Sequence, residues 1–297
     1  MEMRPPYRKL RLPTLTNLNS MLFETEADAI QWYESQERIL TPDFLKTIPW
    51  DKVKDHPLDP ALIPTLVYMR DVERFTSLYN DELARTPTGK DPAIKRFMER
   101  WSTEETTHGE LFNRFLLEAD FPTSDHWFEE AKKTIPLSYR ISSQIVPRIT
   151  NLFGHHFTAV HMTWGAIHEL SVLNGYQRLW TLAKHPVLEH ILRGIAREEA
   201  MHAFFYWSVA RVKLTQSDFR QRLAKFIIEK FWTPVGQGSK RAHETNAVIQ
   251  TLFSGVDGLE LIHQRVTKRI QQLPGLEELQ KVTNHVRTIT QSPLIKI

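Results

Sequence analysis

The 297-residue sequence contains no cysteine. This absence excludes disulfide bonds, a thiolate nucleophile, cysteine-ligated zinc and any iron–sulfur cluster held by this chain. It suits a reducing compartment, so we expect a cytoplasmic protein. Glycine is also scarce, with 11 residues, and apolar residues recur with a period near 3.6 over long stretches. Together with an apolar content of 41%, these features predict an all-α fold built as one large helical domain.

Long apolar runs and an excess of one charge are lacking too. No stretch of about 18 apolar residues occurs, and Met1–Tyr7 lacks the apolar segment of a secretory signal, so we expect neither a membrane span nor export. The net charge is +3, which describes either an ordinary solvated surface or a basic face for an acidic partner protein. Basic residues at 211–213, 220–230 and 240–241 are candidates for such a face. No basic cluster is interleaved with aromatic residues, so nucleic-acid binding is not expected.

Helical periodicity and turn residues divide the predicted domain, residues 1–297, into three parts. A leader (1–23) precedes a four-helix core (about 60–214), and a helical extension (215–297) follows. The core helices are expected at 60–84, 91–119, 142–182 and 186–214. An earlier helix should open with a pattern close to a capping box at Thr25 and end near residue 41, and a loop should cover 48–59. The extension should contain three or four helices, broken at 233–234, 254–255 and 274–275.

Two core segments each place a glutamate and a histidine three residues apart, in Glu105–His108 and Glu199–His202. On a helix this spacing puts both side chains on one face, so each pair offers a carboxylate oxygen and an imidazole nitrogen to one point. One such pair is expected by chance, and we assign Glu260–His263 to chance. Ionisable groups in an apolar stripe are costly to bury without a partner or a metal ion. The two core pairs are therefore candidate metal ligands.

The positions of Glu73 and Glu169 strengthen this prediction. Glu73 precedes Glu105 by 32 residues (105 − 73), and Glu169 precedes Glu199 by 30 (199 − 169). The midpoint of each interval falls in a turn-like, proline-containing segment. If each turn joins antiparallel helices, residues equidistant from it lie side by side. Two packed hairpins would then bring six side chains to one level of the core, as in di-iron carboxylate proteins. The six candidate metal and catalytic residues are Glu73, Glu105, His108, Glu169, Glu199 and His202.

The chemistry of this set favours two redox-active ions. Four glutamates and two neutral histidines carry a formal charge of −4, which balances two Fe(II) ions. Hard carboxylate oxygens also favour the higher oxidation states reached once dioxygen has bound. Two Mn ions could occupy the same ligands. The set therefore predicts a site that activates dioxygen and oxidises a substrate held nearby in the core.

Trp101-Ser-Thr-Glu-Glu-Thr-Thr-His-Gly-Glu110 resembles the Trp-Thr-Ala-Glu-Glu-x-x-His-Gly stretch of the soluble acyl-acyl carrier protein desaturases, which have a ferritin-like helical bundle. Ile195-Ala-Arg-Glu-Glu-Ala-Met-His202 is similar to their second motif, Ile-Ala-x-Asp-Glu-x-x-His. Leu66-Val-Tyr-Met-Arg-Asp-Val-Glu73 fits the segment that carries their first ligand. The resemblance covers roughly residues 45 to 215.

The resemblance implies a function and a role for each ligand. Glu73 and His108 would serve one iron, Glu169 and His202 the other, and the remaining two glutamates would bridge. Members of the family are homodimers that use dioxygen and two external electrons to desaturate a fatty acyl chain carried on acyl carrier protein. A ferredoxin-type donor would supply the electrons, since this chain has no cysteine.

Several departures leave the reaction open. Plant-type enzymes carry threonine one turn after the third glutamate, where this chain has Val172, and aspartate where it has Glu198. Trp50 occupies the place of a family tryptophan near the metals, or belongs simply to the core. Gly165 and Ala166 leave room for a substrate slot or for close helix packing.

Other functions remain open as well. A ribonucleotide reductase small subunit would need a tyrosine where Phe112 stands, and rubrerythrin-type proteins need cysteine. A di-metal N-oxygenase or an oxidase acting on a free small acid or amine is an alternative enzyme. A metal-binding bundle without turnover is an alternative of a different class. Four histidines between residues 155 and 168 do not share the face of Glu169, and we expect them to be structural or exposed.

Overall fold

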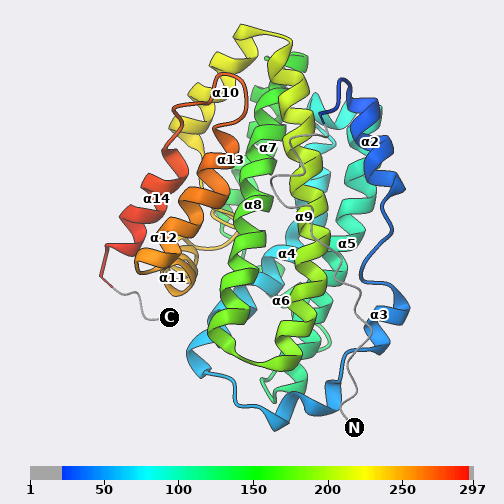
Figure 1. Ribbon diagram of the computed structural model, residues 1–297, viewed down its shortest axis with the longest axis vertical. Coiled ribbons are helices and arrows are strands. Elements are labelled where there is room, and N and C mark those ends of the chain that lie inside the picture. Colours follow the sequence, from blue (N-terminus) through cyan, green and yellow to red (C-terminus); the bar gives the residue numbers. More distant parts are fainter. Residues whose placement is uncertain (1–21, 294–297) are drawn as a thin grey trace.

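The computed structural model describes residues 22–293, and this part of the chain is helical without named strands, which confirms the all-α prediction. Most of the predicted leader lies outside the described residues. Four long helices form the core: α4 (Ile63–Leu83), α5 (Pro92–Glu118), α8 (Phe157–Ala183) and α9 (Pro186–Thr215). Helices α4 and α5 pack as one hairpin, α8 and α9 as the other (Figure 1). In the described part, none of the helices combines the length and apolar content needed to cross a bilayer.

Local sequence explains where the core helices begin. Asp91 caps α5 by accepting hydrogen bonds from the backbone N–H groups of Ala93 and Ile94, and proline follows it at the first helical position. His185 caps α9 in the same way through the N–H of Leu188. At the earlier helix α2 (Glu26–Ser35), the predicted capping box at Thr25 is present. These caps set the two turns about which the hairpins fold.

The prediction of one helix over residues 142–182 is wrong. The segment contains α7 (Leu137–Asn151), a 3₁₀ turn (Gly154–His156) and then α8. Gly154 has a φ of +53°, a left-handed conformation that interrupts a right-handed helix and that glycine adopts readily. The predicted loop at 48–59 also contains a 3₁₀ helix at Trp50–Asp55, and α2 ends earlier than expected.

Shorter helices cover the two sides of the core. The extension contains α10 (Asp218–Phe231), α11 (Ala242–Phe253), α12 (Val256–Ile262), α13 (Lys268–Ile270) and α14 (Lys281–Thr290). A π-helical segment (His263–Thr267) joins α12 to α13 without a break, so the helices are interrupted where the sequence predicts it. Helix α11 packs on α4 and α8, and α10 packs on α8. On the other side α2 packs against α5 and α9 (Figure 1). Helices α3 (Pro42–Lys46) and α6 (Trp127–Thr134) lie in the connections.

Candidate metal centre

All six predicted ligand residues meet in the middle of the core. Each is buried, with no more than 7% of its surface exposed. One comes from α4, two from α5, one from α8 and two from α9. They form two groups of four whose potential ligand atoms lie within 4.8 Å of one another, and the two groups share Glu105 and Glu199. The hairpin register predicted from the sequence therefore brings together the expected side chains.

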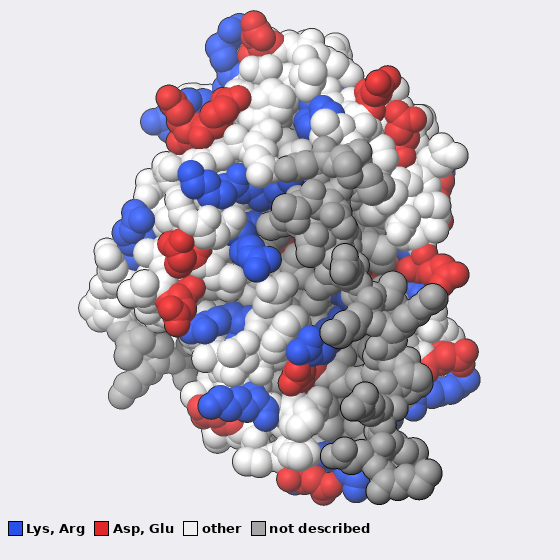
Figure 2. All heavy atoms as spheres, in the orientation of Figure 1, with Lys and Arg blue, Asp and Glu red and all other residues white. Residues whose placement is uncertain are grey.

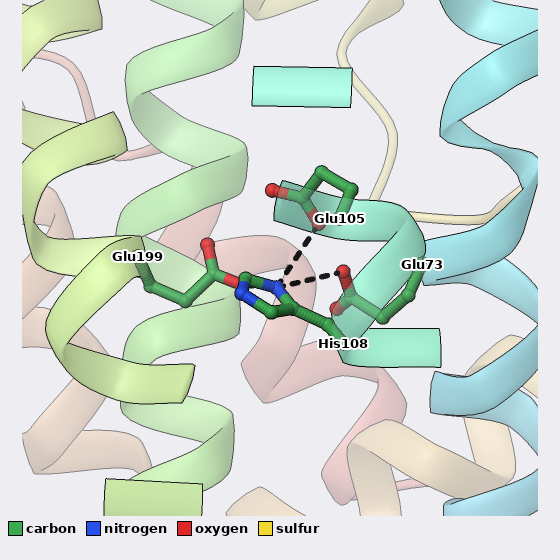
Figure 3. A group of neighbouring side chains, drawn as sticks. All are labelled: Glu73, Glu105, His108 and Glu199. Atoms are coloured by element: carbon green, nitrogen blue, oxygen red, sulfur yellow. Dashed lines mark ion pairs between the residues drawn. The ribbon is translucent and has the colours of Figure 1, made fainter. Parts of the chain in front are cut away.

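The first group surrounds the Nδ1 atom of His108 (Figure 3). This nitrogen lies 3.6 Å from Glu73 Oε2, 3.4 Å from Glu105 Oε2 and 3.1 Å from Glu199 Oε1. A carboxylate on α4, one on α5 and one on α9 thus converge on a single imidazole. Such a set of oxygen and nitrogen donors suits a first-row transition-metal ion.

The second group surrounds the Nδ1 atom of His202. This atom lies 3.1 Å from Glu105 Oε1, 3.4 Å from Glu199 Oε2 and 3.8 Å from Glu169 Oε2. Glu105 and Glu199 therefore turn one oxygen toward each histidine. This is the arrangement that two bridging carboxylates require, and the imidazole rings lie 6.1 Å apart between their centres.

Unsatisfied polar atoms at the centre fit a metal ion. Glu105 Oε1, His108 Nδ1 and Glu199 Oε1 are buried and form no hydrogen bond of good geometry, although His108 Nδ1 lies 3.1 Å from Glu199 Oε1 and Glu105 Oε1 lies 3.1 Å from His202 Nδ1. Ligand atoms this close need a proton or a metal ion between them, because an unsatisfied polar atom in a core costs roughly 1–3 kcal/mol. The two groups of donors could together hold two ions.

Without a bound ion, protons would have to balance the charge of the cluster. Burial raises the pKa of Glu73 to about 8, and the nearby charge of Glu105 adds to the shift. Burial, with the charge of Glu199, raises the pKa of Glu169. Burial opposes protonation of both histidines, but the surrounding carboxylates raise their pKa values well above the usual range.

The two shared glutamates behave in the opposite way. Burial acts to raise the pKa of Glu105 and of Glu199, but hydrogen bonds and the positive charge of His108 lower both values. Without a bound ion, these shifts favour carboxylates at Glu105 and Glu199 and favour protons on the other four groups. Two divalent ions would replace that positive charge.

The outer nitrogen of each histidine contacts a glutamate from the other motif. His108 Nε2 lies 3.0 Å from Glu198 Oε2, and His202 Nε2 lies 2.8 Å from Glu104 Oε2. The first glutamate of each Glu-Glu-x-x-His motif thus orients the histidine of the other motif, across the contact between α5 and α9. A carboxylate on the outer nitrogen fixes the ring and leaves the inner nitrogen free for a metal ion.

The segment around the end of α2 holds both orienting glutamates. Tyr33 Oη donates to Glu104 Oε2 at 2.7 Å. The backbone N–H groups of Ile39 and Leu40 donate to Glu198 Oε1 at 2.8 and 2.9 Å. Burial opposes ionisation of both glutamates, but hydrogen bonds to the histidines and these donors lower their pKa values. Neither glutamate was predicted to have a role, although each is the first residue of a Glu-Glu pair in its motif.

Two aromatic side chains contact the unshared glutamates. Trp101 Nε1 donates to Glu169 Oε1 at 3.1 Å, and the hydroxyl of Tyr176 donates to Glu73 Oε1. Both residues are buried, as is Phe112, whose ring centre lies 5.7 Å from that of Tyr176. Each unshared carboxylate is therefore positioned by a hydrogen-bond donor.

Other candidates lie away from the cluster. Trp50 is half-buried and its ring packs 4.1 Å from the guanidinium of Arg114. His263 contacts Thr283, so the third Glu-x-x-His pair is not part of the cluster. His168 lies between Trp164 and the Thr233 carbonyl, which fits the structural role expected of it.

The basic residues predicted as a docking face do not form one continuous surface. Lys240 is buried and pairs with Asp71 and Glu244, and Arg220 is nearly buried beside the Lys213 carbonyl. Neither can belong to a docking face. On the face that Figure 2 shows, Lys and Arg are scattered among Asp and Glu.

The space beside Gly165 is filled. A Cβ atom there would lie 2.3 Å from the Tyr206 ring, so this glycine serves close helix packing and not a substrate slot. An apolar cavity of about 80 Å³ lies instead between α4, α8 and the extension. Glu73 and Tyr176 are among its lining residues. Its apolar lining includes Met69, Val72, Val172, Gly175, Val248, Ile249 and Leu252.

Comparisons of this chain with protein-family models, curated proteins and solved structures found no match. The function must therefore be inferred from the structure, which has a buried cluster that could hold two metal ions and an apolar cavity next to it.

Metal binding is expected to displace protons. Near pH 7 two divalent ions should release up to about four protons, from Glu73, Glu169 and the two histidines, because only the deprotonated groups bind metal. The number should fall above about pH 8, where Glu73 is already ionised, and metal affinity should weaken as the pH falls. Calorimetric titration in buffers of different ionisation enthalpy measures the release. Binding without proton release would contradict the assignment.

The crossed contacts predict which ion each glutamate supports. Glu198→Ala should weaken the ion held with His108, and Glu104→Ala the ion held with His202, each by roughly 10–100-fold. Anaerobic Fe(II) titration, resolved into two sites, measures both affinities. Glu260→Ala is the matched control, because this glutamate lies away from the cluster. Equal weakening of both ions in either variant would contradict the crossed pairing.

Proposed function

We propose that this protein is a di-iron oxidoreductase that uses dioxygen and external electrons to desaturate an acyl chain carried on acyl carrier protein. The observation that supports it most is the pair of four-residue groups sharing Glu105 and Glu199, placed against an apolar cavity that reaches Glu73. The resemblance of the two Glu-Glu-x-x-His segments to acyl carrier protein desaturases points to the same chemistry.

Each part of the chain has a task in this proposal. Glu73 and His108 would hold one ion, Glu169 and His202 the other, and the shared glutamates would bridge them. When bound, two iron ions would supply the capacity to reduce dioxygen and oxidise a C–H bond. Glu104 and Glu198 keep the imidazoles oriented, and the packed core excludes water from the ligands. Two Mn ions remain compatible with the same donors.

The cavity favours an apolar chain over a free small acid. Among the described residues that line it, none is lysine, arginine or histidine, so no cation is available to hold a carboxylate. Most of the lining is aliphatic or aromatic, which suits methylene groups. The cavity is large enough for only a short part of an acyl chain. We therefore infer that lining residues of α11 and α14 move aside when a longer acyl chain binds.

Two features of the site bear on the outcome of the reaction. Val172 lines the cavity one turn after Glu169 and offers no hydrogen bond where plant-type desaturases carry threonine. Trp50 packs against Arg114 and, within the described part of the chain, forms no hydrogen bond with the six candidate ligands, so it offers no hydrogen-bonded path for electrons from a ferredoxin-type donor. Hydroxylation in place of desaturation is therefore an outcome that the product analysis must distinguish.

We also propose a homodimer formed through α7. A row of large apolar side chains along this helix is between 47% and 83% exposed. The row consists of Leu137, Ile141, Ile145, Val146, Ile149 and Leu152. Single exposed apolar residues are common, but a row along a whole helix marks a contact surface. Two copies of the row, packed about a two-fold axis, would cover each other.

Product analysis tests the proposed reaction. The iron-loaded protein, supplied with dioxygen, ferredoxin and its reductase, should convert carrier-bound acyl chains to products two mass units lighter. Free fatty acids and small amines should remain unchanged. Mass spectrometry distinguishes desaturation from hydroxylation. Oxidation of free acids or amines alone would contradict the proposal and support the alternative oxidase or N-oxygenase.

Filling the cavity should separate substrate binding from metal binding. A Cβ atom at Gly175 would lie 3.6 Å from both Leu252 and Met69, so the larger side chain of Gly175→Leu must extend into the cavity. We expect product formation to fall by at least about tenfold while iron content stays the same. Val256→Leu, at a site 85% exposed on α12, is the control. Unchanged turnover in the Gly175 variant would show that the chain binds elsewhere.

The α7 surface predicts a change of assembly. Ile141→Glu combined with Ile145→Glu should convert a dimer to a monomer, because burying charges against an apolar partner is costly. Light scattering coupled to size exclusion measures the mass. Val256→Glu should leave the dimer intact. A monomeric wild-type protein, or a dimer that persists in the double variant, would rule out this interface.

A further inference from the structure

One oxidisable side chain occupies the boundary between the metal cluster and the cavity. Tyr176 lies on α8, two turns after Glu169, and is fully buried. Its hydroxyl donates a hydrogen bond to Glu73 Oε1, and its ring forms part of the cavity lining. The phenol therefore contacts a proposed iron ligand on one side and the proposed substrate space on the other.

We propose that Tyr176 is a redox-active residue that is oxidised when the di-iron site has reacted with dioxygen and the cavity holds no substrate. The oxidant is the oxidising equivalent that dioxygen leaves on the two iron ions, so this inference rests on the proposed function. In the step, the phenol loses one electron to the metal pair and its O–H bond breaks. The proton passes to Glu73 along the existing hydrogen bond, and a neutral tyrosyl radical remains.

The local contacts favour this proton-coupled step. An oxidised phenol that kept its proton would be a cation in an apolar surrounding, which is costly to bury. The carboxylate oxygen of Glu73 already accepts the hydrogen bond from this hydroxyl, so the proton has a place to go without solvent. The neighbouring ring of Phe112 and the apolar cavity wall keep water from the radical.

Other oxidisable groups are less well placed. Trp101 also donates to a proposed ligand, Glu169, but its indole does not line the cavity. Tyr33 contacts Glu104, which orients a histidine and is not one of the six proposed ligands. Tyr206 packs against Trp101 and Gly165. Tyr176 alone among these four both contacts a proposed ligand and borders the substrate space. A bound acyl chain would compete with it for the same oxidising equivalent.

Rapid-freeze electron paramagnetic resonance tests the proposal. The full-length protein is loaded anaerobically with Fe(II), mixed with dioxygen without substrate or reductant, and frozen at successive times. Iron oxidation is followed optically in the same mixture. We expect a phenoxyl-type signal whose hyperfine splitting collapses when the protein is made with ring-deuterated tyrosine. The deuterated wild-type protein needs no substitution, so this arm does not depend on the folding of a variant.

Two variants locate the radical. Tyr176→Phe keeps the ring and should bind two iron ions but lose the signal, whereas Tyr206→Phe should retain it. Iron oxidation without any radical in the wild-type protein, or a signal that persists in Tyr176→Phe, would overturn the inference and leave the proposed function standing. Failure of bound iron to react with dioxygen at all would overturn both.

Discussion

The structure depends on the burial of four carboxylates and two imidazoles at one level of a helical core. Burying any one of these charges by itself would cost desolvation free energy. Packing interactions do not offset the cost of burying two like charges together. Without a bound ion, the pKa shifts favour protons on Glu73, Glu169 and the histidines and favour ionised Glu105 and Glu199. Two divalent cations would supply the same compensation. The cluster therefore requires a compensating positive charge, which either protons or metal ions can supply.

The two sides of the core have different tasks. On the α5–α9 side, the outer nitrogens of the histidines contact Glu104 and Glu198, and the end of α2 holds those glutamates with Tyr33 and two backbone N–H groups. On the α4–α8 side, Glu73 lines an apolar cavity that the extension closes. The first side fixes the histidines, and the second leaves Glu73 next to space for an apolar molecule. This division would suit the proposed function, because it gives rigid donors on one side and a shaped apolar space on the other.

The crossed contacts also join the two hairpins. Glu104 belongs to α5 and supports a histidine on α9, whereas Glu198 belongs to α9 and supports a histidine on α5. Both glutamates also accept hydrogen bonds from the chain around the end of α2. A displacement of either hairpin would therefore break the two Glu–His contacts and hydrogen bonds to this segment. The candidate ligands are thus coupled through the fold, and any shared ion would couple them further.

The sequence by itself determined the all-α class, the turns at which the hairpins fold and the six residues of the cluster. Helical spacing and distance from a turn fix which side chains share a level, and these are properties of the local chain. Tertiary structure decided the rest. That Glu104 supports His202 and not the histidine of its own motif follows from the contact between hairpins. That Tyr206 fills the space at Gly165, while the cavity opens at Gly175, depends on side chains from distant helices. Tyr176 on α8 reaches Glu73 on α4 across 103 residues of sequence, and no periodic pattern within either helix contains that contact.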